Sequence, residues 1–323
     1  MKKNLVEDFI NQRYVVALVG PTAIGKTSLA LLLSNVLPLE IISADSRQIY
    51  KFMDIGTAKP SQEERERVPH HFIDICNPDE YYSAGQFAKD AWNVIDQIFA
   101  KSKLPFIVGG SGLYIKALCE GIFEEDFTPE EKAQALKIRK ELSFLSKETL
   151  YAKLLEVDPD TAKLYPDKNQ VRLIRALEFY FLKGVPISFY RRTFHKSPNF
   201  KPIYLGLTCS REKLYAKIEQ RVDLMWQMGL VEEVQHLLDM GYNPRLSSLN
   251  TVGYKETIDF LNKKLSQLQA IELIKRNTRR YAKRQITWFN KNTKIRWFDV
   301  GAQFLESSIL EFLVNYNANI LES

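Results

Sequence analysis

Short apolar runs rich in β-branched residues alternate with stretches of helical periodicity along much of the chain. Four of these runs have the pattern of buried strands: 14–19 (YVVALV), 40–44 (EIISA), 105–110 (PFIVGG) and 203–207 (IYLGL). Between them lie stretches such as 84–100, whose apolar positions recur at helical spacing. Buried strands that alternate with helices predict an α/β fold, with a parallel sheet flanked by helices.

The alternation stops between residues 126 and 198. This segment has helical periodicity, charged faces and several prolines, and it contains no evident strand pattern. We therefore predict a helical lobe at 126–198, inserted into an α/β core that is formed by residues 1–125 and 199–323.

The stretch 265–289 predicts a long amphipathic helix near the C-terminus. Its expected apolar stripe consists of Leu268, Ile271, Ile274, Thr278, Tyr281 and Trp288. The basic residues of the stretch lie largely off that stripe, so the helix can bury one side and present the other to solvent or to a ligand.

Charge is concentrated in this C-terminal region. The chain of 323 residues has a net charge of +6, whereas residues 271–300 alone hold nine Lys or Arg against two acidic residues. A basic stripe on an otherwise balanced surface is typical of a nucleic-acid site, and it is also what a solvated helix face looks like. The segment by itself does not distinguish these two interpretations.

The remaining composition excludes several classes of protein. Three scattered cysteines without a CxxC pair argue against a disulfide framework and a cysteine zinc site. The adjacent histidines His70 and His71 have no third ligand nearby, so we interpret them as structural. No apolar run reaches about 18 residues, and the N-terminus lacks the pattern of a secretory signal, so we expect a cytoplasmic protein without a membrane span.

Residues 20–27 carry the strongest chemical signal. The sequence GPTAIGKT matches G-x-x-x-x-G-K-[ST] and lies between a predicted strand and a predicted helix. Backbone N–H groups, the helix N-terminus and Lys26 would surround phosphate oxygens, and the Thr27 hydroxyl would be a ligand of Mg²⁺. The predicted phosphate-binding residues are Gly20, Pro21, Thr22, Ala23, Ile24, Gly25, Lys26 and Thr27. The motif does not distinguish a nucleoside triphosphate from a diphosphate ester.

Three further residues are candidates for chemistry, each with more than one interpretation. Asp45 follows the strand at 40–44 and is a candidate metal ligand, helix cap or general base. Ser111 follows a double glycine, either as a hydroxyl donor to a ligand or as part of a tight turn. Arg221, in a helical pattern, would either clamp a diphosphate or form a surface ion pair.

Eight sequence blocks, in order, resemble the bacterial tRNA dimethylallyltransferases, and the resemblance covers roughly residues 14–298. They are GPTAIGKT, ISADSRQIYKFMDIGTAKP, PHHFIDI, FIVGGSGLYIKAL, VRLIRALEFY, RVDLMWQMGLVEEV, NTVGYKE and TRRYAKRQITWF. The resemblance implies a P-loop α/β protein with a helical insertion. It also implies that the P-loop holds dimethylallyl diphosphate with Mg²⁺ for transfer to the adenosine just 3′ of the anticodon in tRNAs that read U-starting codons.

The resemblance also implies residue roles. Asp45 would be the general base at the adenine amine, with Ser111, where the family commonly has threonine, and Arg221 beside the departing diphosphate. The expected tRNA contacts are Asp45, Ser46, Arg47, Gln48, Ser111, Lys132, Val171, Arg172, Leu173, Ile174, Arg175, Asn250, Thr251, Val252, Gly253, Tyr254 and Lys255, with Arg279, Arg280, Lys283 and Arg284 on the basic helix. The expected partners are dimethylallyl diphosphate and the anticodon stem-loop of tRNA, bound by a monomer.

Three other functions stay open at this point. A small-molecule kinase would share the P-loop and an acidic residue but would not need a basic C-terminal helix. A prenyltransferase acting on free adenylate could use the same core without a surface for a polyanion. A non-catalytic RNA-binding GTPase is less compatible, because the chain contains no N-K-x-D motif.

Overall fold

The structure, a computed structural model, describes residues 2–123 and 128–321. The chain divides into two compact units, of which unit 1 comprises residues 1–119 with 198–323 and unit 2 comprises residues 120–197.

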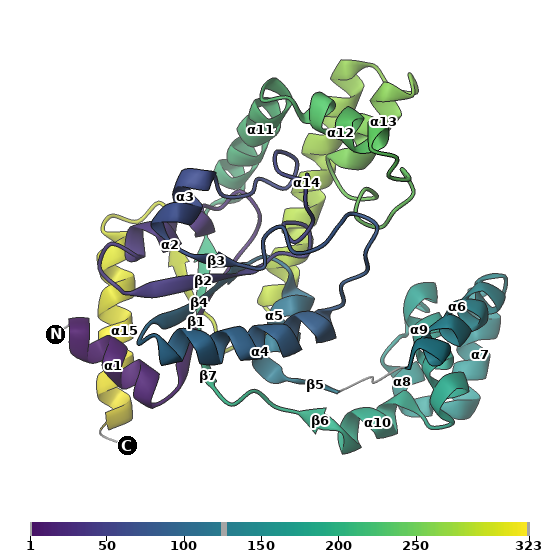
Figure 1. Cartoon of the computed structure of the whole chain (residues 1–323), viewed down its shortest axis with the longest axis horizontal. Helices are drawn as coiled ribbons and strands as arrows, with labels where there is room; N and C mark the ends of the chain where they lie inside the picture. The colour runs from purple at the N-terminus through teal and green to yellow at the C-terminus, as the bar shows by residue number, and fades with distance from the viewer. Residues whose placement is uncertain (1, 124–127, 322–323) are drawn as a thin grey trace. The chain divides into compact units, whose positions relative to one another are not determined.

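A six-stranded parallel sheet forms the centre of unit 1 (Figure 1), in the order β3-β2-β4-β1-β7-β8. Its strands are β1 (Tyr14–Val19), β2 (Leu39–Ala44), β3 (His70–His71), β4 (Leu104–Gly109), β7 (Lys201–Thr208) and β8 (Arg296–Asp299). This confirms the predicted α/β class and all four predicted strands. The sequence patterns missed β3 and β8, because these short strands lie at the two edges of the sheet and are only partly buried, so neither forms an apolar run.

Unit 1 also contains helices, only some of which cover the sheet (Figure 1). Its helices are α1 (Lys2–Asn11), α2 (Lys26–Leu33), α3 (Gln62–Arg67), α4 (Ala84–Ala100), α5 (Gly112–Glu120), α11 (Arg211–Gln227), α12 (Leu230–Asp239), α13 (Tyr254–Leu261), α14 (Gln267–Phe289) and α15 (Leu305–Leu321). The first and last of these, α1 and α15, lie side by side (Figure 1). No helix in the described ranges is long and apolar enough to cross a membrane.

The alternation of side chains along the strands explains why both faces of the sheet need a helical layer. Val16 and Leu18 of β1 pack with Phe106 of β4 and with apolar residues of α1, α2, α11 and α15 in one core. The intervening residues Val15 and Ala17 point to the opposite face and are also fully buried. On a two-sided parallel sheet such strands read as continuous apolar runs, which is why the sequence showed them clearly.

The long helix α14 forms where the sequence predicted it, but the predicted apolar stripe is only partly its buried side. Ile274 is buried as expected, whereas Leu268 is 72% exposed and Trp288 is 39% exposed. The buried residues of α14 are Ala270, Ile274, Ala282, Gln285 and Phe289. The prediction from large apolar residues was therefore partly wrong. Small side chains and the amide of Gln285 form much of the buried side of α14 and allow the helix to pack closely.

Unit 2 is a helical lobe with its own core. Its elements are β5 (Ile122–Phe123), α6 (Pro129–Ser143), α7 (Lys147–Val157), α8 (Pro159–Lys163), α9 (Gln170–Lys183), α10 (Ile187–Thr193) and β6 (His195–Lys196). Buried leucines of α7 and α9, such as Leu154 and Leu177, form the centre of this core. The unit begins at Glu120 rather than at 126, and β5 pairs antiparallel with β6, a strand that the helical pattern of this segment did not indicate.

Glu40 is a carboxylate inside β2, with a side chain that is only 2% exposed. His71 Nε2 lies 2.8 Å from its carboxylate, and Lys103 Nζ and Lys101 Nζ lie 3.0 Å and 3.2 Å from it. Burial alone would raise the pKa of Glu40, but the hydrogen bonds from His71, Lys103 and Lys101 outweigh burial and lower the pKa to about 2. His71 is thus structural, as predicted.

We expect Glu40→Gln to lower the free energy of unfolding by roughly 2 kcal/mol at pH 7, because a buried carboxylate with matched donors is lost. The pKa of Glu40 is depressed in the folded state, so its contribution is complete above about pH 4.5 and is lost as the pH falls toward 2. Urea unfolding at several pH values measures this. The exposed Glu311→Gln is the control, and equal midpoints for both variants would contradict the stabilising role.

Candidate active site

Three loops leave the same edge of the sheet side by side. In the parallel register Gly109 of β4 pairs with Ala44 of β2 on one side and with Val19 of β1 on the other. The segments that begin at Gly20, Asp45 and Gly110 therefore emerge next to each other at the carboxyl ends of the strands. This edge is where α/β folds of this kind bind ligands.

The lysine of the phosphate loop bonds to the backbone of the loop itself. Lys26 Nζ donates hydrogen bonds to the carbonyl oxygens of Gly20 at 3.0 Å and Pro21 at 2.8 Å. Lys26 and Thr27 form the first turn of α2, where the free N–H groups of the helix favour an anion. The ammonium group is thus already held at the mouth of an anion cradle.

Three charged side chains interact at this edge. Burial is the largest cause that lowers the pKa of Lys26 to about 8; Asp45 opposes it, and Arg221 adds to it. Burial also lowers the pKa of the Arg221 guanidinium, and Asp45 again opposes it. Lys26, Arg221 and Asp45 therefore share one electrostatic environment with two cations and one carboxylate, which favours an anionic ligand.

The segment after β2 holds Asp45 in a turn rather than at a helix start. Asp45 Oδ1 accepts a hydrogen bond from the backbone N–H of Arg47 at 2.8 Å. Residues 46–49 form a turn, so the helix-cap interpretation of Asp45 is wrong. Ser111 Oγ accepts from the backbone N–H of Ser46 at 3.0 Å and donates to Ser46 Oγ at 3.2 Å. The ends of β2 and β4 are therefore tied together beside Asp45.

Two other residues of the turn have structural partners. Gln48 accepts from Ser43 Oγ at 2.9 Å, and its Nε2 donates to the carbonyl oxygens of Thr57 and Ala58 at 3.3 Å and 3.0 Å. Arg47 Nη1 donates to the carbonyl oxygen of Ser247 at 2.9 Å. Gln48 thus uses both ends of its amide within the protein.

Gln285 of α14 is a site residue that the sequence patterns missed. Its Oε1 accepts a hydrogen bond from the backbone N–H of Thr22 at 2.8 Å, and its Nε2 donates to the carbonyl oxygen of Gly110 at 2.9 Å. A Cβ at Gly110 would lie 2.2 Å from Gln285 Nε2, and a Cβ at Gly112 would lie 2.3 Å from the ring of Trp288. The two glycines are needed for α14 to approach the phosphate loop.

Glu233 of α12 fixes another loop of the site region. Its carboxylate accepts from the backbone N–H groups of Asp54, Ile55 and Gly56 at 2.8, 2.7 and 3.1 Å. Tyr254 donates its hydroxyl to the same carboxylate at 2.6 Å. Burial, and then the charge of Glu233, raise the pKa of Tyr254 well above its usual value.

Tyr254 therefore corrects an expectation from the sequence. Its side chain is fully buried and cannot reach a tRNA in this structure. Around it, Gly253 is also buried, Thr251 and Val252 are partly exposed, and Asn250 and Lys255 are exposed. Only part of this predicted tRNA segment is thus free to touch a ligand.

The basic residues of α14 fall into two groups. Lys275 Nζ lies 2.8 Å from Asp223, and Arg279 Nη1 donates to Glu219 at 2.7 Å, so both tie α14 to α11. The exposed group is Arg276, Arg280, Lys283 and Arg284. Arg279, a predicted tRNA contact, is therefore already engaged in an ion pair.

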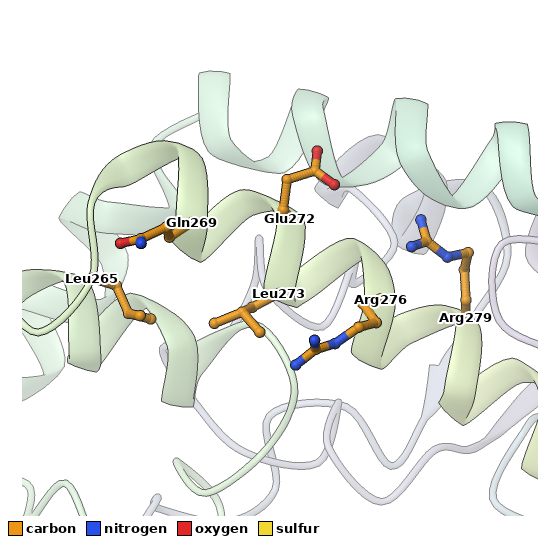
Figure 2. Close-up of a pocket in the computed structure, with 6 residues that line it drawn as sticks. All are labelled: Leu265, Gln269, Glu272, Leu273, Arg276 and Arg279. Carbon is orange, nitrogen blue, oxygen red and sulfur yellow. The ribbon is translucent and has the colours of Figure 1, made fainter.

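Two hollows follow the surface of α14. One, of about 470 Å³, is lined by Leu265, Gln269, Glu272, Leu273, Arg276 and Arg279 (Figure 2). In Figure 2, Glu272 and Arg279 point toward the neighbouring helix, whereas Arg276 points away from it, toward Leu273. The second, of about 380 Å³, is lined by Arg280, Lys283, Arg284, Thr287, Trp288 and Lys291, and combines cations with an indole ring.

All but one of the predicted tRNA residues of unit 2 lie on α9, and they differ in exposure. Val171 is 77% exposed, whereas Leu173 and Ile174 are 0% and 9% exposed in the core of the unit. These two side chains pack inside the lobe, which corrects the expectation that they contact tRNA. Arg175 pairs with the buried Glu178, and Arg172 lies over the ring of Tyr165. Lys132 belongs to α6, but its side chain lies outside the described part of the structure.

The residues at the sheet edge fit a divalent cation only in combination with a ligand. Across residues 2–123 and 128–321, no group of three or more His, Cys, Asp or Glu is placed to hold a metal ion. The Thr27 hydroxyl, in the first turn of α2, has no partner among these residues, and Asp45 lies in the environment of the neighbouring Lys26. A hydroxyl and a carboxylate are hard oxygen donors, suited to a cation that a bound diphosphate would help to hold.

Comparison with known proteins agrees with this geometry. A sequence model of the IPP transferase family matches residues 48–292. The tRNA dimethylallyltransferase of Pelotomaculum thermopropionicum is 46% identical over 286 residues, which are 88% of this chain and 90% of the relative. The enzyme of the same description from Natranaerobius thermophilus is 43% identical over 305 residues, 93% of this chain and 90% of the relative.

Solved structures show the same fold. The full-length tRNA isopentenylpyrophosphate transferase of Bacillus halodurans is 37% identical, with a TM-score of 0.67 over 96% of this chain and 97% of that protein. A eukaryotic dimethylallyltransferase, captured acting on tRNA, is 28% identical, with a TM-score of 0.75 over 89% of this chain and 74% of that protein. On these similarities in sequence and structure, the chain belongs to the IPP transferase family.

Proposed function

We propose that this chain transfers the dimethylallyl group of dimethylallyl diphosphate to the N6 amine of the adenosine 3′-adjacent to the anticodon, in tRNAs that read U-starting codons. The observation that carries the proposal is the shared environment of Asp45, Lys26 and Arg221 beside the phosphate loop. It combines a base for the acceptor with cations for the departing diphosphate. The relatives named as tRNA dimethylallyltransferases support the choice of substrates.

In the proposed reaction the C–O bond between the allyl carbon and the diphosphate breaks, and a bond from the adenine nitrogen to that carbon forms. The amine is a poor nucleophile because its lone pair is delocalised into the ring, so removal of its proton by Asp45 assists bond formation. The Arg47 N–H holds Asp45 Oδ1, which fixes the orientation of the carboxylate. Asp45 accepts the proton, and diphosphate leaves.

The donor would lie against residues 20–27. The N–H groups at the start of α2, Lys26 and Arg221 would bind its phosphate oxygens and stabilise the charge that grows as the diphosphate departs. A bound Mg²⁺, held by the Thr27 hydroxyl together with diphosphate oxygens, would neutralise part of the same charge. Ser111, tied to Ser46, would lie beside the departing diphosphate.

The RNA would bind through the exposed basic side of α14. Arg280, Lys283 and Arg284 are exposed there and line one hollow with Trp288. Such a surface suits a phosphate backbone, and a single-stranded anticodon loop allows the target base to leave its stack at low cost. We propose that the chain acts as a monomer.

The direct test is incubation of the purified protein with Mg²⁺, dimethylallyl diphosphate and unmodified tRNA. Mass spectrometry of the digested nucleosides should show adenosine with one added C₅H₈ unit. Modification of free AMP instead of tRNA would identify an adenylate prenyltransferase. If neither is modified and ATP is consumed with a small-molecule acceptor, the kinase interpretation replaces this one.

We expect Asp45→Asn to lower kcat by about 10²- to 10⁴-fold, because the amide keeps the shape of the carboxylate but cannot accept the proton. The Kd of the donor should stay the same or fall, because the variant removes a negative charge from an anion site. Single-turnover transfer and calorimetric donor binding measure the two effects. Asp239→Asn, on the exposed side of α12, is the control. Near-normal turnover would remove Asp45 from the base role.

Donor binding should depend on the charge of Lys26. Because the pKa of Lys26 is lowered to about 8, the free enzyme loses this cation as the pH rises through 8, and affinity for the diphosphate should fall by up to about tenfold per pH unit above that value. Calorimetry from pH 7 to 10, in buffers of different ionisation enthalpy, should show proton uptake on binding above pH 8. Lys26→Arg keeps its charge, so its affinity should not vary over this range. An unchanged wild-type affinity at pH 10 would contradict the prediction.

The exposed cations of α14 should strengthen tRNA binding through electrostatic attraction to its phosphates. Replacing Arg280 and Arg284 together by alanine should weaken tRNA binding and reduce the slope of log K against log salt by about 1.5 to 2. Lys201→Ala, at the amino end of β7 and thus at the opposite edge of the sheet, is the control. Filter binding at several salt concentrations gives both quantities. An unchanged slope would mean that this face of α14 is only a solvated helix surface.

A further inference from the structure

We propose that Tyr81 is a stacking platform for an unstacked base of the RNA, next to the adenosine that is modified. The inference rests on the proposed function, since it adds a contact to the same RNA. The Tyr81 side chain is 84% exposed, more than any other large apolar residue that the structure describes as exposed. A ring that is this exposed contributes little to core packing, so core packing does not explain why an aromatic residue stands here.

The backbone around Tyr81 is fixed at several points. Cys76 forms a β-bridge with Tyr50, and Lys51 N–H donates to the Cys76 carbonyl at 2.9 Å. The buried Ser248 donates its hydroxyl to the carbonyl oxygen of Pro78 at 2.6 Å.

The residue after Tyr81 is held equally firmly. The Tyr114 hydroxyl donates to the carbonyl oxygen of Tyr82 at 3.0 Å, and the Tyr82 hydroxyl donates to Asp90 at 2.7 Å. Tyr81 is therefore an exposed ring on an ordered backbone, which is the pre-organised arrangement that binding favours.

The same supports connect Tyr81 to the candidate active site. Ser248, which holds Pro78, follows Ser247, whose carbonyl oxygen accepts from Arg47. The segment with Tyr81 and the segment with Arg47 thus share one anchor. Tyr114 bonds to the carbonyl of Tyr82, and burial is the main cause that raises its pKa. Tyr81 and Asp45 also raise this pKa and Arg47 lowers it, as expected if these groups lie near one another.

The chemistry of the surroundings favours a nucleobase over an apolar partner. Tyr81 is the most exposed of the large apolar side chains described as exposed. The cation Arg47 is anchored to Ser247, next to the Ser248 that holds Pro78. A docking site for a protein would need a contiguous apolar patch. A base stacks on a single ring face and brings a phosphate that a nearby cation can bind.

The test compares Tyr81→Ala, Tyr81→Phe and wild type in binding an unmodified anticodon stem-loop. Tyr81→Ala should weaken the RNA affinity roughly 5- to 100-fold and raise the KM for RNA to match. The KM for dimethylallyl diphosphate and kcat at saturating RNA should not change. Tyr81→Phe keeps the ring and should bind like wild type. Phe304→Ala, another highly exposed aromatic of unit 1, is the matched control and should have no effect.

Two readouts separate stacking from other causes. The salt slope of binding should be the same for Tyr81→Ala and wild type, because stacking releases no counterions, unlike loss of the α14 cations. Stem-loops with one abasic nucleotide at each position flanking the target adenosine should include one on which Tyr81→Ala and wild type bind equally.

Equal binding of Tyr81→Ala and wild type to the intact stem-loop would overturn the proposal. A loss that persists on every abasic RNA would also overturn it, and would indicate a contact with backbone or with another macromolecule. Because binding is measured apart from transfer, a wild-type protein that binds the RNA without modifying it would contradict the proposed function while leaving this inference measurable.

Discussion

The side-chain amide of Gln285 holds the candidate active site together. It satisfies the Thr22 N–H of the phosphate loop and the Gly110 carbonyl at the end of β4, at 2.8 and 2.9 Å. Because the amide is buried, its removal would leave a backbone donor and a backbone acceptor unpaired, each at a cost of about 1–3 kcal/mol. The same helix presents the exposed Arg280, Lys283 and Arg284. The surface proposed for RNA is therefore rigidly connected to the loop proposed for the donor, which is the arrangement that a transfer between two substrates needs.

A second buried group supports the site from further away. The Glu233 carboxylate accepts hydrogen bonds from three consecutive backbone N–H groups and from the Tyr254 hydroxyl. It thus binds the loop at 54–56 as an anion would. Lys59 then ties that loop to the carbonyl oxygen of Tyr50 and to Asp54 and Asp74. Part of the sequence that resembles the family thus forms contacts within the protein that support the candidate active site.

Whether a feature could be predicted from the sequence depends on how far apart along the chain its interacting residues lie. The strands at 14–19 and 105–110 and the phosphate loop are encoded by neighbouring residues, so local patterns predicted them. The bond from Gln285 to Thr22 spans 263 positions and depends on how α14 is docked, and no local pattern contains that information. The buried side of α14 was misjudged for the same reason, because Ala282 packs in the apolar core and Gln285 faces the backbone of Gly110. Tyr254 was expected to contact tRNA because of the resemblance to the family, and no local pattern shows that its hydroxyl bonds to Glu233 of another helix.

The electrostatics of the crevice explain how one site can bind a diphosphate and also help to expel it. Lys26 is bonded to two carbonyl oxygens, and burial lowers the pKa values of Lys26 and Arg221. A bound prenyl diphosphate would place charge-assisted bonds where Lys26 now has neutral ones. The departing diphosphate carries one more negative charge than the ester, so it would interact more strongly with both cations. On the proposed mechanism the buried cations would therefore stabilise the transition state more than the bound donor, and that difference, not the affinity for the donor itself, would accelerate the reaction.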